Sequence, residues 1–102
     1  MPEFYGLHGR MVATPGEGDA LAALLLEGAE GLADIEGCRL YVISRDPKDR
    51  DSVWITEVWT DQAAHDASLK DPRVRAVIQR ARPLIASVAD SMEFVPVGGK
   101  GV

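Results

Sequence analysis

One stretch near the middle of the chain, residues 52–59, is largely apolar on both faces that a β-strand would present. Its β-branched and aromatic residues, without Gly or Pro, predict a strand. Its side chains fall into two opposed sets: Val53, Ile55, Glu57 and Trp59 against Trp54, Thr56 and Val58. A sheet with one wet face would alternate apolar and polar residues. We therefore expect cover on both sides, from the chain's own helices and from a second copy of the chain.

The same kind of pattern predicts three other strands, over residues 4–14, 38–45 and 92–97. In the first of them, His8 and Arg10 share a face. The polar residues 46–51 separate two of the predicted strands and are expected to form the loop of a hairpin.

Apolar residues at helical spacing predict the helices. The first opens at residues 16–19 and carries a stripe of Leu21, Leu24, Leu25, Ala29 and Leu32. A short helix over residues 62–69 would be capped by Asp61. A longer helix would begin at Asp71 and Pro72, and Pro83 should kink or split it. Its predicted stripe is Val74, Val77, Ile78, Ala81, Ile85 and Val88, and its arginines 73, 75, 80 and 82 are interpreted as a solvated face.

This order of elements, βαββαβ, predicts an α+β, ferredoxin-like fold with one antiparallel sheet and helices on one of its faces. We expect a single domain over residues 1–97, followed by a flexible tail over residues 98–102. The other face of the sheet would be bare in a monomer, which favours a homodimer.

Composition narrows the possible partners. The chain of 102 residues has a net charge of −5, which disfavours nucleic acid and anionic membranes. No apolar run approaches the ~20 residues of a membrane span, and no signal peptide is visible. The single cysteine, Cys38, excludes an internal disulfide and is compatible with a cytoplasmic location. Without a ligand-spaced cluster or a nucleotide-binding loop, we expect no metal and no flavin cofactor.

Several short motifs carry a family resemblance. The segment 37–41 has the form Gly-Cys-x-x-Tyr, and Glu57-Val58-Trp59 is followed by the alanines 63 and 64. Arg10 and the Pro-Gly pair at 15 and 16 precede them. In this order the motifs resemble the antibiotic biosynthesis monooxygenase family over roughly residues 5–97.

The resemblance implies a dimeric α+β barrel, in which two sheets pack through their helix-free faces. It also implies oxidation of phenols, hydroquinones or anthrones with O2, without metal or flavin; some relatives degrade haem. Ser68 stands where such proteins commonly carry a histidine, and His65 lies one helical turn earlier. That departure counts against the haem-degrading alternative. A non-catalytic dimer that binds a small molecule is another alternative.

Three residues are candidates for the base that such chemistry needs. His65 is the most natural one, because histidine titrates near neutral pH; it could equally be a solvent-facing residue beside Asp66. His8 could be a base or a residue of the barrel interface. Glu57 could be a base, an orienting partner of His8 or Arg10, or half of a buried ion pair.

Four further residues are candidates for contacts with an aromatic substrate. Trp59 could form a wall of the pocket or be ordinary core. Tyr41 could donate a hydrogen bond to a substrate oxygen or be a sheet tyrosine with a wet hydroxyl. Arg10 and Ser68 complete the set of polar groups that could hold the ring.

Overall fold

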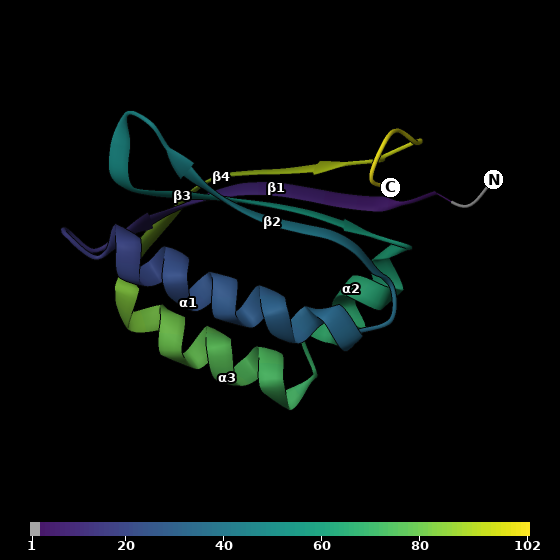
Figure 1. Cartoon of the computed structure of the whole chain (residues 1–102), viewed down its shortest axis with the longest axis horizontal. Coiled ribbons are helices and arrows are strands. Elements are labelled where there is room, and N and C mark those ends of the chain that lie inside the picture. Colours follow the sequence, from purple (N-terminus) through teal and green to yellow (C-terminus); the bar gives the residue numbers. More distant parts are fainter. Residues whose placement is uncertain (1–2) are drawn as a thin grey trace.

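A four-stranded antiparallel sheet forms one layer of the molecule and the helices form the other (Figure 1). The computed structural model describes residues 3–102, so residues 1 and 2 of the expected domain lie outside it. The strands are β1 (Tyr5–Ala13), β2 (Cys38–Asp46), β3 (Asp49–Trp59) and β4 (Ile85–Phe94), in the order β2-β3-β1-β4. The helices are α1 (Gly18–Gly31), α2 (Gln62–Ser68) and α3 (Pro72–Ala81), with 3-10 turns η1 (Leu32–Asp34) and η2 (Arg82–Leu84). The predicted ferredoxin-like α+β fold is confirmed.

The pairing of the strands decides which side chains share a face. Glu57 of β3 lies opposite Leu7 of β1 and Tyr41 of β2. The adjacent row, on the other face, contains Val42, Thr56, His8 and Met92, one residue from each strand. We call the face with Glu57 the helix-covered face and the face with His8 the helix-free face. The alternation predicted for residues 52–59 places Glu57 and Trp59 together on the helix-covered side.

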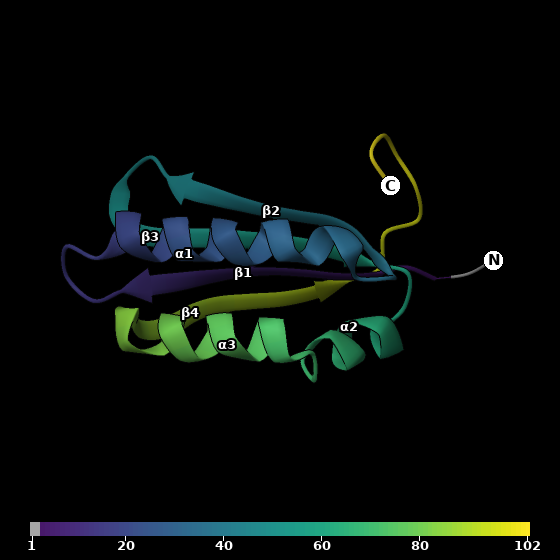
Figure 2. The same cartoon turned by 60° about the horizontal axis from the view of Figure 1, so that its bottom comes forward.

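Helices α1 and α3 run antiparallel, side by side, across the helix-covered face (Figures 1 and 2). Gly28 allows their close approach: a β-carbon there would lie 2.9 Å from Cγ1 of Val77. The buried core lies between these helices and the central strands, and its members are Ala13, Leu21, Leu24, Leu25, Val53, Ile55 and Ala81. Three of them, Leu21, Leu24 and Leu25, belong to the stripe predicted for the first helix.

The short helix α2 and the following α3 begin where their caps predict. An Asp61 carboxylate oxygen accepts a hydrogen bond from Ala64 N at 2.7 Å, and Asp71 accepts one from Arg73 N at 2.8 Å. Pro72 occupies the first turn of α3, where its missing N–H costs nothing. These caps place α2 at one end of the sheet, directly after β3 (Figure 2).

Two predicted boundaries are wrong. Pro83 ends the long helix in η2, and residues from Ile85 onward form β4, so Ile85 and Val88 belong to a strand that begins seven residues before Met92. The polar segment 46–51 is mostly strand, because β2 extends to Asp46 and β3 starts at Asp49. Only Pro47 and Lys48 form the turn between them.

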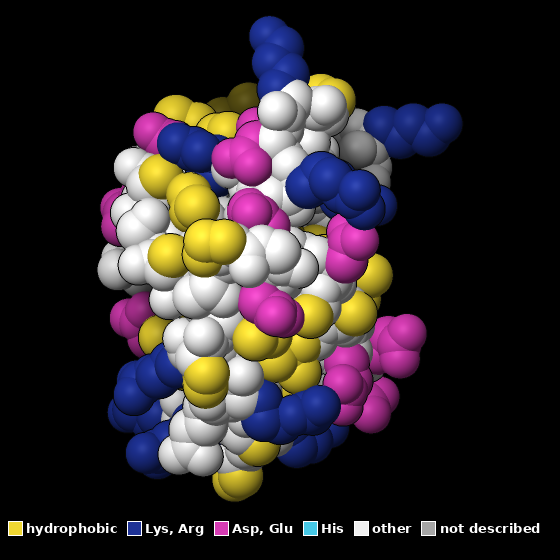
Figure 3. Space-filling view, turned by 90° about the vertical axis from the view of Figure 1, so that its left-hand side faces the viewer, with side chains coloured by type: hydrophobic (Ala, Val, Ile, Leu, Met, Phe, Trp, Pro, Cys, Tyr) yellow, Lys and Arg dark blue, Asp and Glu magenta, His cyan; other side chains and the backbone are white. Residues whose placement is uncertain are grey.

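Charges of both signs are mixed with apolar side chains at the end of the molecule that carries this turn (Figure 3). There Asp19, in the first turn of α1, forms ion pairs with Arg45 at 2.9 Å and Arg50 at 3.2 Å. These pairs connect the hairpin to the start of α1. Within residues 3–102, no helix is both long and apolar enough to cross a membrane.

Candidate functional site

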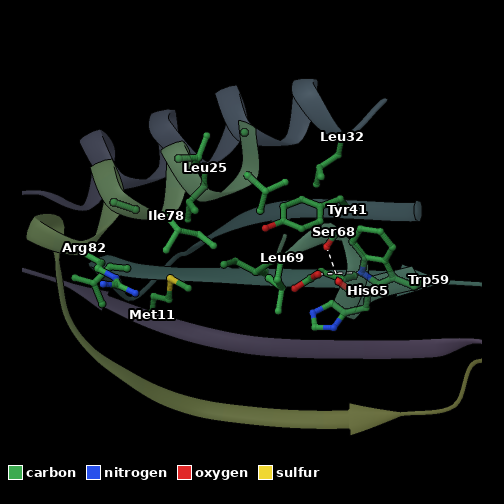
Figure 4. Close-up of a pocket in the computed structure, with 17 residues that line it drawn as sticks. Met11, Leu25, Leu32, Tyr41, Trp59, His65, Ser68, Leu69, Ile78 and Arg82 are labelled. Atoms are coloured by element: carbon green, nitrogen blue, oxygen red, sulfur yellow. Dashed lines mark hydrogen bonds between the residues drawn. The ribbon is translucent and has the colours of Figure 1, made fainter. Parts of the chain in front are cut away.

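A cavity of about 230 Å³ lies between the helix-covered face of the sheet and the three helices (Figure 4). Most of its wall is apolar, and that part consists of Met11, Leu25, Gly28, Leu32, Ile55, Trp59, Leu69, Val74, Val77, Ile78, Ala81 and Ile85. Five polar residues complete the lining: Tyr41, Glu57, His65, Ser68 and Arg82. Such a cavity, apolar with a few convergent polar groups, is typical of a small-molecule site.

Glu57 is the acid of the cavity. Burial raises the pKa of its carboxyl, while a hydrogen bond from Trp59 and the nearby His65 oppose that shift. The bond runs from Trp59 Nε1 to Glu57 Oε1 at 3.0 Å. Glu57 forms no ion pair among the described residues, so the interpretation of a buried pair that fixes the sheet is wrong. A carboxyl group with these surroundings can accept or donate a proton nearer neutral pH than an exposed one.

His65 lines the cavity from α2, and three neighbours hold its ring. Its Nδ1 lies 3.0 Å from Oδ1 of Asp66. Its ring packs edge-on against Trp59, with 5.7 Å between centroids, and lies 5.3 Å from the ring of Tyr5. An ionised carboxylate can only accept, so Nδ1 is the donor in this contact, and in a neutral imidazole Nε2 would be the lone-pair acceptor. An imidazole oriented by a carboxylate is the usual arrangement of a general base.

Tyr41 and Ser68 lie at the same end of the cavity as His65 and Trp59 (Figure 4). Burial raises the pKa of the Tyr41 hydroxyl, and the Glu57 carboxyl adds to the shift, so Tyr41 stays a neutral donor. The Ser68 hydroxyl donates to the backbone oxygen of His65 at 2.6 Å, which engages its proton within α2. The Ser68 hydroxyl therefore has its proton occupied by the turn that carries His65.

The other two predicted site residues, His8 and Arg10, do not reach this cavity. They lie on the helix-free face, where His8 pairs with Thr56 and Arg10 with Trp54 across the strands. The prediction that Glu57 orients His8 or Arg10 is therefore wrong, because the sheet itself separates them. The faces shared within β1 and within β3 were interpreted correctly, but the register between β1 and β3 is a property of the fold.

On the helix-free face, His8 and Arg10 form a cluster with Trp54. The His8 ring stacks on Trp54 with 4.8 Å between centroids, and its Nδ1 lies 2.9 Å from the Thr56 hydroxyl. The Arg10 guanidinium lies 5.9 Å from the Trp54 centroid and pairs with Asp90 at 2.8 Å. This cluster belongs to a surface of the sheet, separate from the cavity.

Two cavity-related residues escaped the sequence analysis. Asp66 was considered only as a neighbour that would make His65 solvent-facing, whereas it orients the ring. Arg82 is exposed, as its assignment to a solvated face predicts, but it also lines the cavity. A signal for Arg82 existed, because residues 74, 78 and 82 follow one another at i, i+4 and i+8 on the helical stripe.

No group of three or more His, Cys, Asp or Glu side chains within residues 3–102 is arranged to hold a metal ion. The polar groups of the cavity are instead suited to hydrogen bonding and proton transfer.

Comparisons with known proteins agree with this architecture. Residues 4–80 match the family model described as "Antibiotic biosynthesis monooxygenase". A Chloroflexus aurantiacus protein, provisionally assigned as an antibiotic biosynthesis monooxygenase, shares 52% identity over 94% of this chain and 95% of its own, with a TM-score of 0.88.

More distant structures share the fold alone. A Pseudomonas aeruginosa protein is 20% identical, with a TM-score of 0.84, and covers 96% of this chain and 98% of its own. A Mycobacterium tuberculosis protein is 19% identical, with a TM-score of 0.80, and covers 95% and 98%. No curated protein matches the sequence.

Proposed function

We propose that this chain, which belongs to the antibiotic biosynthesis monooxygenase family, oxidises a small phenol or hydroquinone-type aromatic with O2 and needs no cofactor. The observation that carries this proposal is the cavity in which His65, oriented by Asp66, and Glu57 share one end of an apolar chamber. Such a chamber excludes water and holds a base against a ring. Its volume of about 230 Å³ lies below the ~300–1,000 Å³ of common ligand sites, which favours one or two rings.

The proposed reaction begins when His65 removes the hydroxyl proton of a substrate such as 1-naphthol. The resulting anion passes one electron to O2, and superoxide then combines with the aryloxyl radical at the carbon para to the oxygen. The peroxide takes up a proton, the hydrogen on that carbon leaves as a proton, and the O–O bond breaks. The products are 1,4-naphthoquinone and water. The substrate supplies all four electrons that reduce O2.

In this reaction Glu57 and Tyr41 hold the ring oxygens. The neutral Tyr41 hydroxyl donates a hydrogen bond to the substrate oxygen, and the raised pKa of Glu57 lets its carboxyl return a proton to the peroxide. Trp59 forms a wall of the cavity and fixes one oxygen of Glu57 through its indole N–H.

The test is oxidation of 1-naphthol under ¹⁸O2, with O2 uptake measured against a protein-free control. Incorporation of one labelled oxygen atom into the quinone is expected of a monooxygenase. His65→Ala should lower the rate by about 10²–10⁴-fold, the usual contribution of a positioned base. His8→Ala is the matched control, since His8 lies on the opposite face, and should keep its rate. Equal rates in both variants would refute the role of His65, and no labelled product with any phenol or quinol would refute the proposed activity.

A second proposal concerns assembly: two copies of the chain pack through their helix-free faces into a dimer. It is supported by apolar side chains on that face, since Val42 is 41% and Met92 55% exposed in the single chain. Sedimentation at micromolar concentration should then give twice the chain mass of 11.0 kDa. A well-folded monomer under those conditions would refute it.

A further inference from the structure

The polar groups of the cavity are unevenly distributed along its length. Tyr41, Ser68, His65 and Trp59 gather at one end, whereas Arg82 lies at the other end near Met11 and Ile78 (Figure 4). Between the two ends the wall is apolar. A bound molecule that spans the cavity therefore meets neutral or acidic groups at one end and a guanidinium at the other.

Arg82 is the only Lys or Arg that lines this cavity. Within residues 3–102 its side chain has no ion pair and no hydrogen bond, whereas its neighbours on α3 are engaged: Arg73 pairs with Asp71 at 3.1 Å and Arg80 with Glu27 at 2.9 Å. An unpaired guanidinium at the rim of an apolar chamber is available to a ligand, and it presents a fork of donors that matches a carboxylate.

The opposite end offers a substrate carboxylate no permanent cation. The buried Glu57 carboxyl is there, and Asp66 contacts His65. A phenolate formed during the reaction is compensated by the proton that His65 takes up, whereas a permanent carboxylate would have no such partner in an apolar environment. The Arg82 end is therefore the one that suits it.

From this asymmetry we infer that the substrate is an aromatic acid, whose ring fills the apolar middle of the cavity and whose carboxylate pairs with Arg82. The identity of the reacting end rests on the proposed function, but the anion subsite does not. This arrangement gives the substrate a single orientation, with its hydroxyl toward His65 and its acid group toward the rim.

The test measures, by titration calorimetry, the binding of two probes of equal shape that carry no phenolic hydroxyl to be oxidised. They are 2-naphthoate and its neutral isostere 2-naphthamide. Arg82→Gln should weaken 2-naphthoate by about 3- to 10-fold, as expected for a partly exposed, charge-assisted contact. It should leave 2-naphthamide unchanged. Arg82→Lys keeps the positive charge and should recover part of the loss. Added salt should weaken only the anionic probe.

Arg75→Gln is the matched control, because Arg75 is an exposed arginine of α3, the helix directly before Arg82, and does not line the cavity. The inference is overturned if the unmodified protein binds the amide as tightly as the carboxylate, or if it binds neither probe. It is also overturned if Arg75→Gln weakens 2-naphthoate binding as much as Arg82→Gln does. Because binding is the readout, these outcomes are distinct from a failure to incorporate ¹⁸O. A protein that binds the acid selectively but oxidises no phenol would retain the subsite and lose the proposed activity.

Discussion

At the scale of single residues, the cavity depends on a coupled pair, Trp59 and Glu57. Trp59 is 1% exposed, so it belongs to the core as well as to the wall of the cavity. Its indole N–H also stabilises the charged form of Glu57, against the effect of burial. Trp59 therefore contributes both to the packing of the core and to the pKa of Glu57.

Glu57 should make the protein less stable as the pH rises. Its folded pKa is raised, so between the unfolded value near ~4.5 and the higher folded value the native state holds a proton that the unfolded state has lost. The free energy of unfolding should fall across that window. In Glu57→Gln this fall should be shallower, as measured by urea unfolding from pH 4 to pH 8. Glu30→Gln, at an exposed position, is the control and should follow the unmodified protein. Parallel curves for all three would contradict the prediction.

Two substitutions distinguish the contribution of the Trp59 ring volume from that of its indole N–H. Trp59→Ala should cost ~3–5 kcal/mol of unfolding free energy, because it leaves a cavity in the core. Trp59→Phe keeps most of the ring and should cost less, but it removes the donor to Glu57. We therefore expect the Phe variant to raise the pKa of Glu57 further, which a carboxyl-resolved NMR titration measures. An unchanged pKa in Trp59→Phe would mean that the N–H does not stabilise the carboxylate.

The sequence predicted the candidate site only where the alternation within a single strand was enough to place the side chains. The alternation of residues 52–59 correctly placed Glu57 beside Trp59. It could not place His8, because that requires the register of β1 against β3. Arg82 is exposed, as its charge predicts, but its spacing from Val74 and Ile78 also places it at the wall of the cavity.

At the scale of elements, the two wrong boundaries have physical causes. β4 is an edge strand, and its pairing with β1 shifts register between Arg10 and Met11 and again between Val12 and Ala13. These irregularities disrupt strict alternation, so the spacing of Ile85 and Val88 resembled a continuing helix. Residues 46–51 are polar because the tip of the hairpin is exposed, and polarity there does not exclude strand pairing. The strong patterns were predicted correctly, because α1 carries one continuous apolar stripe and the central strand β3 is apolar on both faces.

The cap of α2 should control the position of His65. Asp61→Ala should cost ~1 kcal/mol, the usual value of an N-cap. Asp71→Ala removes the same kind of bond from α3 and is the matched control. Only Asp61→Ala should displace the NMR resonances of the His65 ring, and neither variant should move those of His8. Equal displacement of His65 in both would show that α2 is not positioned by its own cap.

At the scale of the whole molecule, one face of the sheet is covered by helices and the other presents Val42, Trp54 and Met92 beside the Arg10–Asp90 pair. A stable protein interface needs a sizeable, complementary surface. A four-stranded sheet can supply one if two copies meet face to face, so the dimer would bury what the fold leaves exposed.

Charge on this face should prevent the proposed dimer. Val42→Lys and Met92→Lys each place an ammonium on the helix-free face, and two-fold symmetry would place two of them in the proposed contact. Either variant should sediment as a folded monomer. Leu26→Lys is the control, because Leu26 is a 51% exposed residue of α1, on the other layer. A dimer that persists in both sheet variants would place the interface elsewhere.

The shortness of α2 also has a consequence for how the cavity fills. This helix has only seven residues, and Ser68 is its single buried member, yet it carries His65. Helices of that length are not stable by themselves and depend on the surface below them. The wall that holds the base thus belongs to a short helix with little burial of its own, and its amides should exchange with deuterium sooner than those of β1 and β3. Transient opening of α2 would then admit the substrate, and a ligand that spans the cavity from His65 to Arg82 should slow that exchange.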